Sequence, residues 1–191
     1  MKPNFSFSII LLLITYLFFS GCKKDPTKNA TLPAATQEGR NTIGFTINGE
    51  VWVPYYKCRS FGNPCGEISA TYGVPGGAAP NAFDLQIIRQ RGSKSSSLTI
   101  SSSGLGTITT IGSKIDSVGV NFTGENSTGN TDSYSGVLSG SKFIITKFDN
   151  QAQIISGEFE LILNEDNGSG KIIILKTGRF DFKFNFCKCS R

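Results

Sequence analysis

Residues 42–53 read TIGFTINGEVWV, and apolar side chains alternate with other residues on both sides of Asn48-Gly49. Alternation with a period of two places every second side chain on one face of a β-strand. An Asn-Gly pair between two such runs is the strongest short-range signal for a two-residue hairpin turn. The stretch therefore predicts an antiparallel β-hairpin with one buried face.

The same alternation recurs along the rest of the chain and is most regular in Arg179–Phe186. There four phenylalanines fall on one face of the predicted strand and polar residues fall on the other. Further strands are predicted at residues 83–89, 97–102, 107–111, 118–123, 143–148, 153–163 and 171–176. Helical spacing with caps, or a fixed-period repeat, is not visible beyond the N-terminal segment. The pattern predicts an all-β domain over residues 42–191, a single antiparallel β-sandwich or barrel of about 8–10 strands.

The N-terminal residues 1–21 predict a lipoprotein signal peptide. Lys2 precedes an apolar run of eleven residues, Ile9–Phe19, whereas a membrane-spanning helix needs about 20. The run ends at Phe19-Ser20-Gly21-Cys22, which resembles the lipobox that a signal peptidase cuts in bacterial lipoproteins. Acyl chains on Cys22 would then anchor the protein in a membrane. The alternatives are an ordinary secretory signal or a single membrane helix.

Residues 22–41 are predicted to form the lipidated N-terminus and a flexible linker. After Cys22 this segment is rich in Thr, Ala, Asn and Pro and lacks apolar periodicity. Its start, Cys22-Lys23-Lys24-Asp25, is typical of lipoproteins of the Bacteroidota.

Together, the signal with its lipobox and the Asn-Gly-x-Val-Trp hairpin at residues 48–52 resemble a Bacteroidota envelope lipoprotein family of unknown function. Residues 144–149, 154–159 and 177–184 are similar to the C-terminal hairpins of that family. The resemblance implies a β-rich fold and a lipid anchor in the cell envelope, expected in the outer membrane, and assigns no catalytic residue. It leaves open whether the domain faces the periplasm or the cell surface.

The chain has five cysteines, and lipidation of Cys22 leaves Cys58, Cys65, Cys187 and Cys189. In an oxidising envelope compartment, four cysteines predict up to two disulfides with three possible connectivities. Cross-pairing between the two pairs is favoured, because residues two apart on a strand lie about 6–7 Å from each other. A Cys₄ metal site is the alternative, but structural zinc usually uses closer pairs. The expectation is therefore disulfides and no metal.

The chain has no histidine, which excludes Ser-His-Asp triads, Cys-His pairs and His-ligated zinc. Glu158 and Glu160 are two residues apart and are candidates for an acid/base pair in glycoside hydrolysis. Their alternation with Phe159 and Leu161 favours the solvated face of a sheet instead. Because no set of nucleophile, base and stabiliser can be assembled, the sequence predicts a protein that is not an enzyme and needs no cofactor.

Trp52, Tyr55 and Tyr56 are candidates for an aromatic platform that stacks on sugar rings, with core packing as the alternative. The net charge of +5 becomes +4 when Lys2 leaves with the signal, and the basic residues are dispersed, so no nucleic-acid partner is predicted. The sequence predicts a membrane-anchored accessory or interaction protein with an envelope protein or a glycan as partner. The alternative is a lipoprotein that binds a glycan or a small apolar molecule.

Overall fold

The computed structural model describes residues 27–55, 68–72, 82–91, 94–102, 118–125 and 131–184. Within these ranges the chain forms ten strands of one antiparallel sheet and no helix, so the all-β prediction is confirmed. The strands are β1 (Thr42–Ile47), β2 (Glu50–Trp52), β3 (Ile68–Tyr72), β4 (Phe83–Arg91), β5 (Lys94–Ser102), β6 (Gly119–Glu125), β7 (Thr131–Val137), β8 (Lys142–Asp149), β9 (Ile154–Glu165) and β10 (Ile172–Lys183). In the described ranges there is no helix long and apolar enough to cross a membrane.

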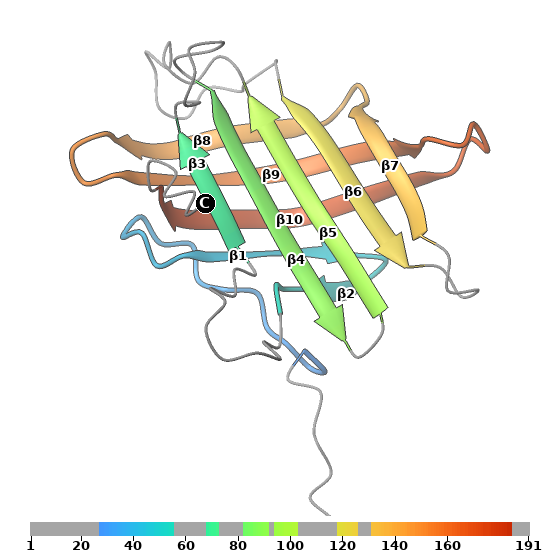
Figure 1. Cartoon of the computed structure of the whole chain (residues 1–191), viewed down its shortest axis with the longest axis horizontal. Coiled ribbons are helices and arrows are strands. Elements are labelled where there is room, and N and C mark those ends of the chain that lie inside the picture. The colour runs from blue at the N-terminus through green and yellow to red at the C-terminus, as the bar shows by residue number, and fades with distance from the viewer. Residues whose placement is uncertain are drawn as a thin grey trace, which may run out of the picture.

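The sheet curls because one long strand changes partners along its length. The strand order is β2-β1-β10-β9-β7-β6-β5-β4-β3, and β8 pairs with β9 off this path. The first part of β9 pairs with β8, and its last residues pair with β7. Figure 1 shows the result: β3 to β7 form one layer that crosses over a second layer formed by β8, β9, β10 and β1.

Aromatic rings from both layers fill the space between them. Phe45 of β1 stacks on Trp52 of β2 with ring centroids 4.8 Å apart. Phe180 of β10 lies 5.5 Å from Phe143 of β8 and 6.4 Å from Phe83 of β4, in the opposite layer. Such ring pairs add to the free energy gained from burial alone. The interior of the described sheet is therefore a packed aromatic core.

The opening hairpin forms as predicted. Thr46 pairs with Val51, and the two turn residues, Asn48 and Gly49, have φ angles of 52° and 81°. Positive φ at both central residues defines the turn that suits the twist of a hairpin, and Asn and Gly adopt it most easily.

The C-terminal strand differs from its prediction. The strand predicted at 171–176 and the first part of the strand predicted at 179–186 form one strand, β10, with a bulge between Leu175 and Gly178. Residues 185 and 186 lie outside the described residues. Thr177 adopts a φ of 50° in this bulge. A Cβ on Gly178 would lie 2.3 Å from the Phe159 ring, so the close approach of that ring requires glycine. The extra residue changes the register without ending the strand.

Strands β3 and β7 were not predicted, because their sequences ISATY and TDSYSGV hold few large apolar residues. The strand predicted at 107–111 lies outside the described residues.

Residues 36–41, part of the segment that is predicted to be a flexible linker, are hydrogen-bonded to the sheet and are called the strap below. Asp181 of β10 is 1% exposed and accepts five hydrogen bonds. The hydroxyls of Thr36 and Ser156 donate at 2.6 and 2.7 Å, and the backbone N–H groups of residues 38–40 donate at 2.8–3.2 Å. Residues 22–26 lie outside the described ranges.

Hydrogen bonding also sets the charge state of Asp181. Burial raises the pKa of a carboxyl group, because it disfavours the charged form. The hydrogen bonds from Thr36, Ser156 and the strap backbone favour the charged form more strongly, and they lower the pKa of Asp181 to about 2. The strap is therefore held by a carboxylate that stays ionised above strongly acidic pH.

Candidate functional site

A pocket of about 360 Å³ opens where the β1–β2 hairpin meets the β4–β5 hairpin, and it is called the hairpin pocket below. In Figure 1, β2 lies behind the lower ends of β4 and β5, and these strands line the pocket together with β6. Pockets of this size are large enough for a small ligand rather than a single ion. Segments far apart in the sequence meet here because the sheet curls.

Trp52 lines the pocket from the core side and is fully buried. Its indole N–H donates to Ser96 Oγ at 3.1 Å, and its ring stacks on the ring of Phe45. The guanidinium carbon of Arg89 lies 5.1 Å from the ring centroid, within the range of a cation–π contact. The structure thus places Trp52 in the core and not on an exposed platform for sugar rings.

Tyr55 is half-buried, follows β2 in the chain and is hydrogen-bonded to β4. Its N–H donates to Ile88 O at 3.2 Å, and Gln90 N–H donates to Tyr55 O at 2.6 Å. These bonds place Tyr55 beside Arg89 in a parallel bridge. Tyr56, the third predicted aromatic, lies outside the described residues.

The lining of the hairpin pocket is predominantly cationic. Among the described lining residues, Arg89 and Arg91 of β4 and Lys94 of β5 contribute positive charges, and Glu50 of β2 contributes a negative charge. Arg91 and Lys94 are cross-strand partners at the facing ends of β4 and β5, and this pairing holds both residues at the pocket. A concave wall with excess positive charge raises the local concentration of anions.

The sequence reasoning missed these cations. All three fall within six residues, Arg89–Lys94, and this cluster of basic residues was the signal that the sequence offered. Ser96 and Glu50 carried no comparable signal, because only the pairing of the hairpins brings them to the pocket.

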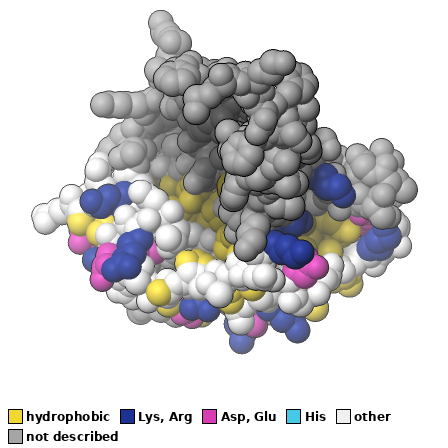
Figure 2. Space-filling model, turned by 90° about the horizontal axis from the view of Figure 1, so that it is seen from below, with side chains coloured by type: hydrophobic (Ala, Val, Ile, Leu, Met, Phe, Trp, Pro, Cys, Tyr) yellow, Lys and Arg dark blue, Asp and Glu magenta, His cyan; other side chains and the backbone are white. Residues whose placement is uncertain are grey.

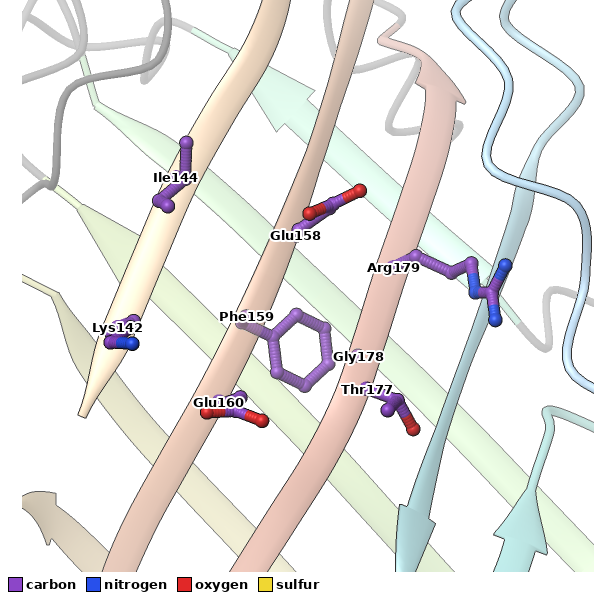
Figure 3. A pocket seen from close by; sticks show the side chains of 8 residues that line it. All are labelled: Lys142, Ile144, Glu158, Phe159, Glu160, Thr177, Gly178 and Arg179. Atoms are coloured by element: carbon purple, nitrogen blue, oxygen red, sulfur yellow. The ribbon is translucent and has the colours of Figure 1, made fainter. Parts of the chain in front are cut away.

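A second hollow, of about 540 Å³, lies on the outer face of β8, β9 and β10 and is called the outer groove. It contains the predicted acid pair, Glu158 and Glu160, whose side chains are exposed. Figure 3 shows both carboxylates on β9, with Lys142 and Arg179 on the neighbouring strands. In the register of the sheet, Glu158 is opposite Arg179 and Glu160 is opposite Lys142.

Opposite charges that face each other across strands stabilise a sheet. In Figure 3 the Arg179 side chain extends towards β1 rather than across β9. Within the described part of the chain, the four charged side chains of the outer groove form no ion pair. This arrangement fits the solvated sheet face that the sequence favoured for Glu158 and Glu160.

Charged side chains elsewhere on the described surface are scattered. Figure 2 shows Lys and Arg at several separate places on the face seen from below, with Asp or Glu beside some of them. The described basic residues on this face form no continuous stripe of the kind that tracks a nucleic-acid backbone.

Five predicted site residues lie outside the described residues: the lipidation site Cys22 and the disulfide candidates Cys58, Cys65, Cys187 and Cys189. Lipidation and disulfide formation therefore stay predictions from the sequence.

Comparisons with protein-family models, curated proteins and solved structures give no match to this chain.

Proposed function

We propose that this protein is a lipid-anchored, non-enzymatic binding protein of the bacterial cell envelope, with the hairpin pocket as its binding site. The observation that carries the proposal is the pocket itself. Its wall combines a fully buried aromatic ring, three cations and the Ser96 hydroxyl, all mounted on strand ends of a packed sheet. A rigid framework with a few convergent polar groups is the usual form of a ligand site.

The anchor part of the proposal rests on the lipobox-like run that ends at Cys22 and on the resemblance to Bacteroidota lipoproteins. An outer-membrane location follows from the same resemblance, and an envelope glycan or an envelope protein is the kind of partner that such a location offers. The aromatic core argues against an apolar guest between the layers, because rings from both layers already occupy that space. This favours a polar ligand in the hairpin pocket over a small apolar molecule.

The non-enzymatic part rests on the chemistry of the two hollows. Hydrolysis of a glycoside needs one carboxyl group that donates a proton and another that acts as base or nucleophile. In the outer groove the two glutamates are exposed on one strand, as expected of a solvated sheet face rather than of an enclosed acid/base pair. Among the described residues that line the hairpin pocket, Glu50 is the one carboxylate.

Blocking the pocket tests the binding role. Ser95 of β5 is exposed and lines the hairpin pocket, so Ser95→Trp should fill it and abolish binding to the glycans that the wild-type protein retains on an array of envelope saccharides. Ser101→Trp is the matched control, because Ser101 is an exposed serine of the same strand that is not part of the pocket lining. Equal retention by both variants would mean that binding occurs elsewhere.

A further inference from the structure

We propose that the hairpin pocket selects a saccharide that carries an oxyanion, either a carboxylate or a sulfate. This inference rests on the proposed function, since it names the class of ligand for the same site. The pocket volume of about 360 Å³ exceeds the need of a bare anion, and its polar lining offers hydrogen bonds to sugar hydroxyls as well as positive charge.

The charge of the lining supplies the first argument. Among the described lining residues, three cations, Arg89, Arg91 and Lys94, stand against one carboxylate, Glu50. Lys94 is exposed and has no ion-pair partner in the described ranges, so its ammonium is available to an incoming anion. A neutral sugar would gain nothing from this field, whereas an oxyanion would be attracted to it.

The orientation of Arg89 supplies the second argument. Its guanidinium lies over the Trp52 ring, and its backbone is fixed by the bridge to Tyr55 and by pairing with Ser96 of β5. A guanidinium held over a ring keeps a fixed orientation, and its planar group is of the kind that recognises the oxygens of a carboxylate or sulfate. Less side-chain freedom is then lost when the anion binds.

The hydroxyl of Ser96 supplies the third argument. Ser96 is 8% exposed, and its oxygen accepts the Trp52 N–H. Within the described part of the chain its own O–H proton has no acceptor. A buried O–H group without an acceptor is costly, so binding of a ligand oxygen that accepts its proton is favourable.

Glu50 adds selectivity. Its carboxylate lies on the opposite hairpin from the cations and repels an anion that enters at that side. An oxyanion is therefore expected to bind at the Arg89–Lys94 side, with the uncharged part of the sugar towards Glu50.

The test is calorimetric titration of the full lipoprotein in detergent with two matched pairs, glucuronate against glucose and N-acetylglucosamine 6-sulfate against N-acetylglucosamine. The charged member of each pair should bind at least about tenfold more tightly, and its affinity should fall as salt is raised. Lys94→Glu should remove this advantage and Glu50→Gln should increase it. Lys142→Glu changes the net charge equally but lies in the outer groove, and it should have no effect.

The outcomes separate the two proposals. If charged and neutral sugars bind equally and Ser95→Trp abolishes both, the pocket binds ligand but does not select an oxyanion. If inorganic sulfate binds as tightly as the sulfated sugar, the saccharide part of the inference is wrong. If none of the sugars binds, or if Ser95→Trp leaves binding unchanged, the pocket is not the ligand site and the proposed function fails with the inference.

Discussion

Replacement of Asp181 by asparagine should lower the free energy of unfolding by about 2–4 kcal/mol, because several charge-assisted hydrogen bonds are lost in a buried site. The carboxylate accepts five hydrogen bonds from Thr36, Ser156 and residues 38–40. An asparagine amide would place an NH₂ group against some of these donors. Urea unfolding at neutral pH, followed by circular dichroism, measures the change as a lower midpoint.

Asp149→Asn is the matched control for this prediction. The Asp149 carboxylate also accepts backbone hydrogen bonds, from Gln151 and Ala152, but in an exposed turn where water can replace them. The cost there should be below about 1 kcal/mol. An equal effect of the two substitutions would show that the buried carboxylate does not hold the strap.

The pH dependence of stability gives an independent readout of the same carboxylate. The pKa of Asp181 is about 2 in the folded protein, against 3.8 for an ordinary aspartate. The folded state therefore binds the proton less readily, so the stabilisation is complete above the unfolded pKa and is lost as pH falls through 3.8 towards 2. At about 1.4 kcal/mol per pKa unit, wild type should lose about 2 kcal/mol more than Asp181→Asn in this window.

Replacement of Cys22 by serine should move the protein from the membrane fraction to the soluble fraction. A serine has no thiol to carry the acyl chains, and each buried CH₂ of such chains contributes about 0.8 kcal/mol to membrane binding. Fractionation of cells that express each form, followed by immunoblotting, measures the distribution.

Cys58→Ser is the matched control for the anchor, because it removes a thiol that the sequence assigns to a disulfide. It should leave the membrane fraction unchanged. Retention of the Cys22→Ser protein in the membrane, with no acyl chains found by intact-mass analysis of the wild type, would contradict the anchor.

The parts of the fold that the sequence predicted are those with strong local patterns. The alternation of phenylalanines in β10 and the Asn48-Gly49 turn each act within a few residues, and both appear as expected. Thr177-Gly178 interrupts the same alternation and was predicted as a break between strands. A bulge and a turn both favour residues that adopt a positive φ, so their sequences look alike. The two are distinguished here by the pairing of β10 with β1 on one edge and with β9 on the other.

The strap and the hairpin pocket could not be predicted, for a different reason. The strap is held largely by backbone N–H groups, which every non-proline residue carries, so its attachment to Asp181 leaves little trace in its composition. The pocket joins Glu50, Trp52 and Lys94 only through the curl of the sheet and the register of two hairpins. Trp52 was a candidate site residue, and the structure shows that it lines the pocket from the core while the cations lie around it.

The central claim, that the hairpin pocket is the binding site, can be tested with the intrinsic fluorescence of the protein. Trp52 is the single tryptophan of the chain, and it lines the pocket beneath Arg89. Titration of the full lipoprotein with glucuronate should change the Trp52 emission to saturation, with the same midpoint as calorimetry, and Lys94→Glu should abolish the change. Calorimetric binding that leaves the emission of Trp52 unaltered would place the ligand elsewhere and contradict the account.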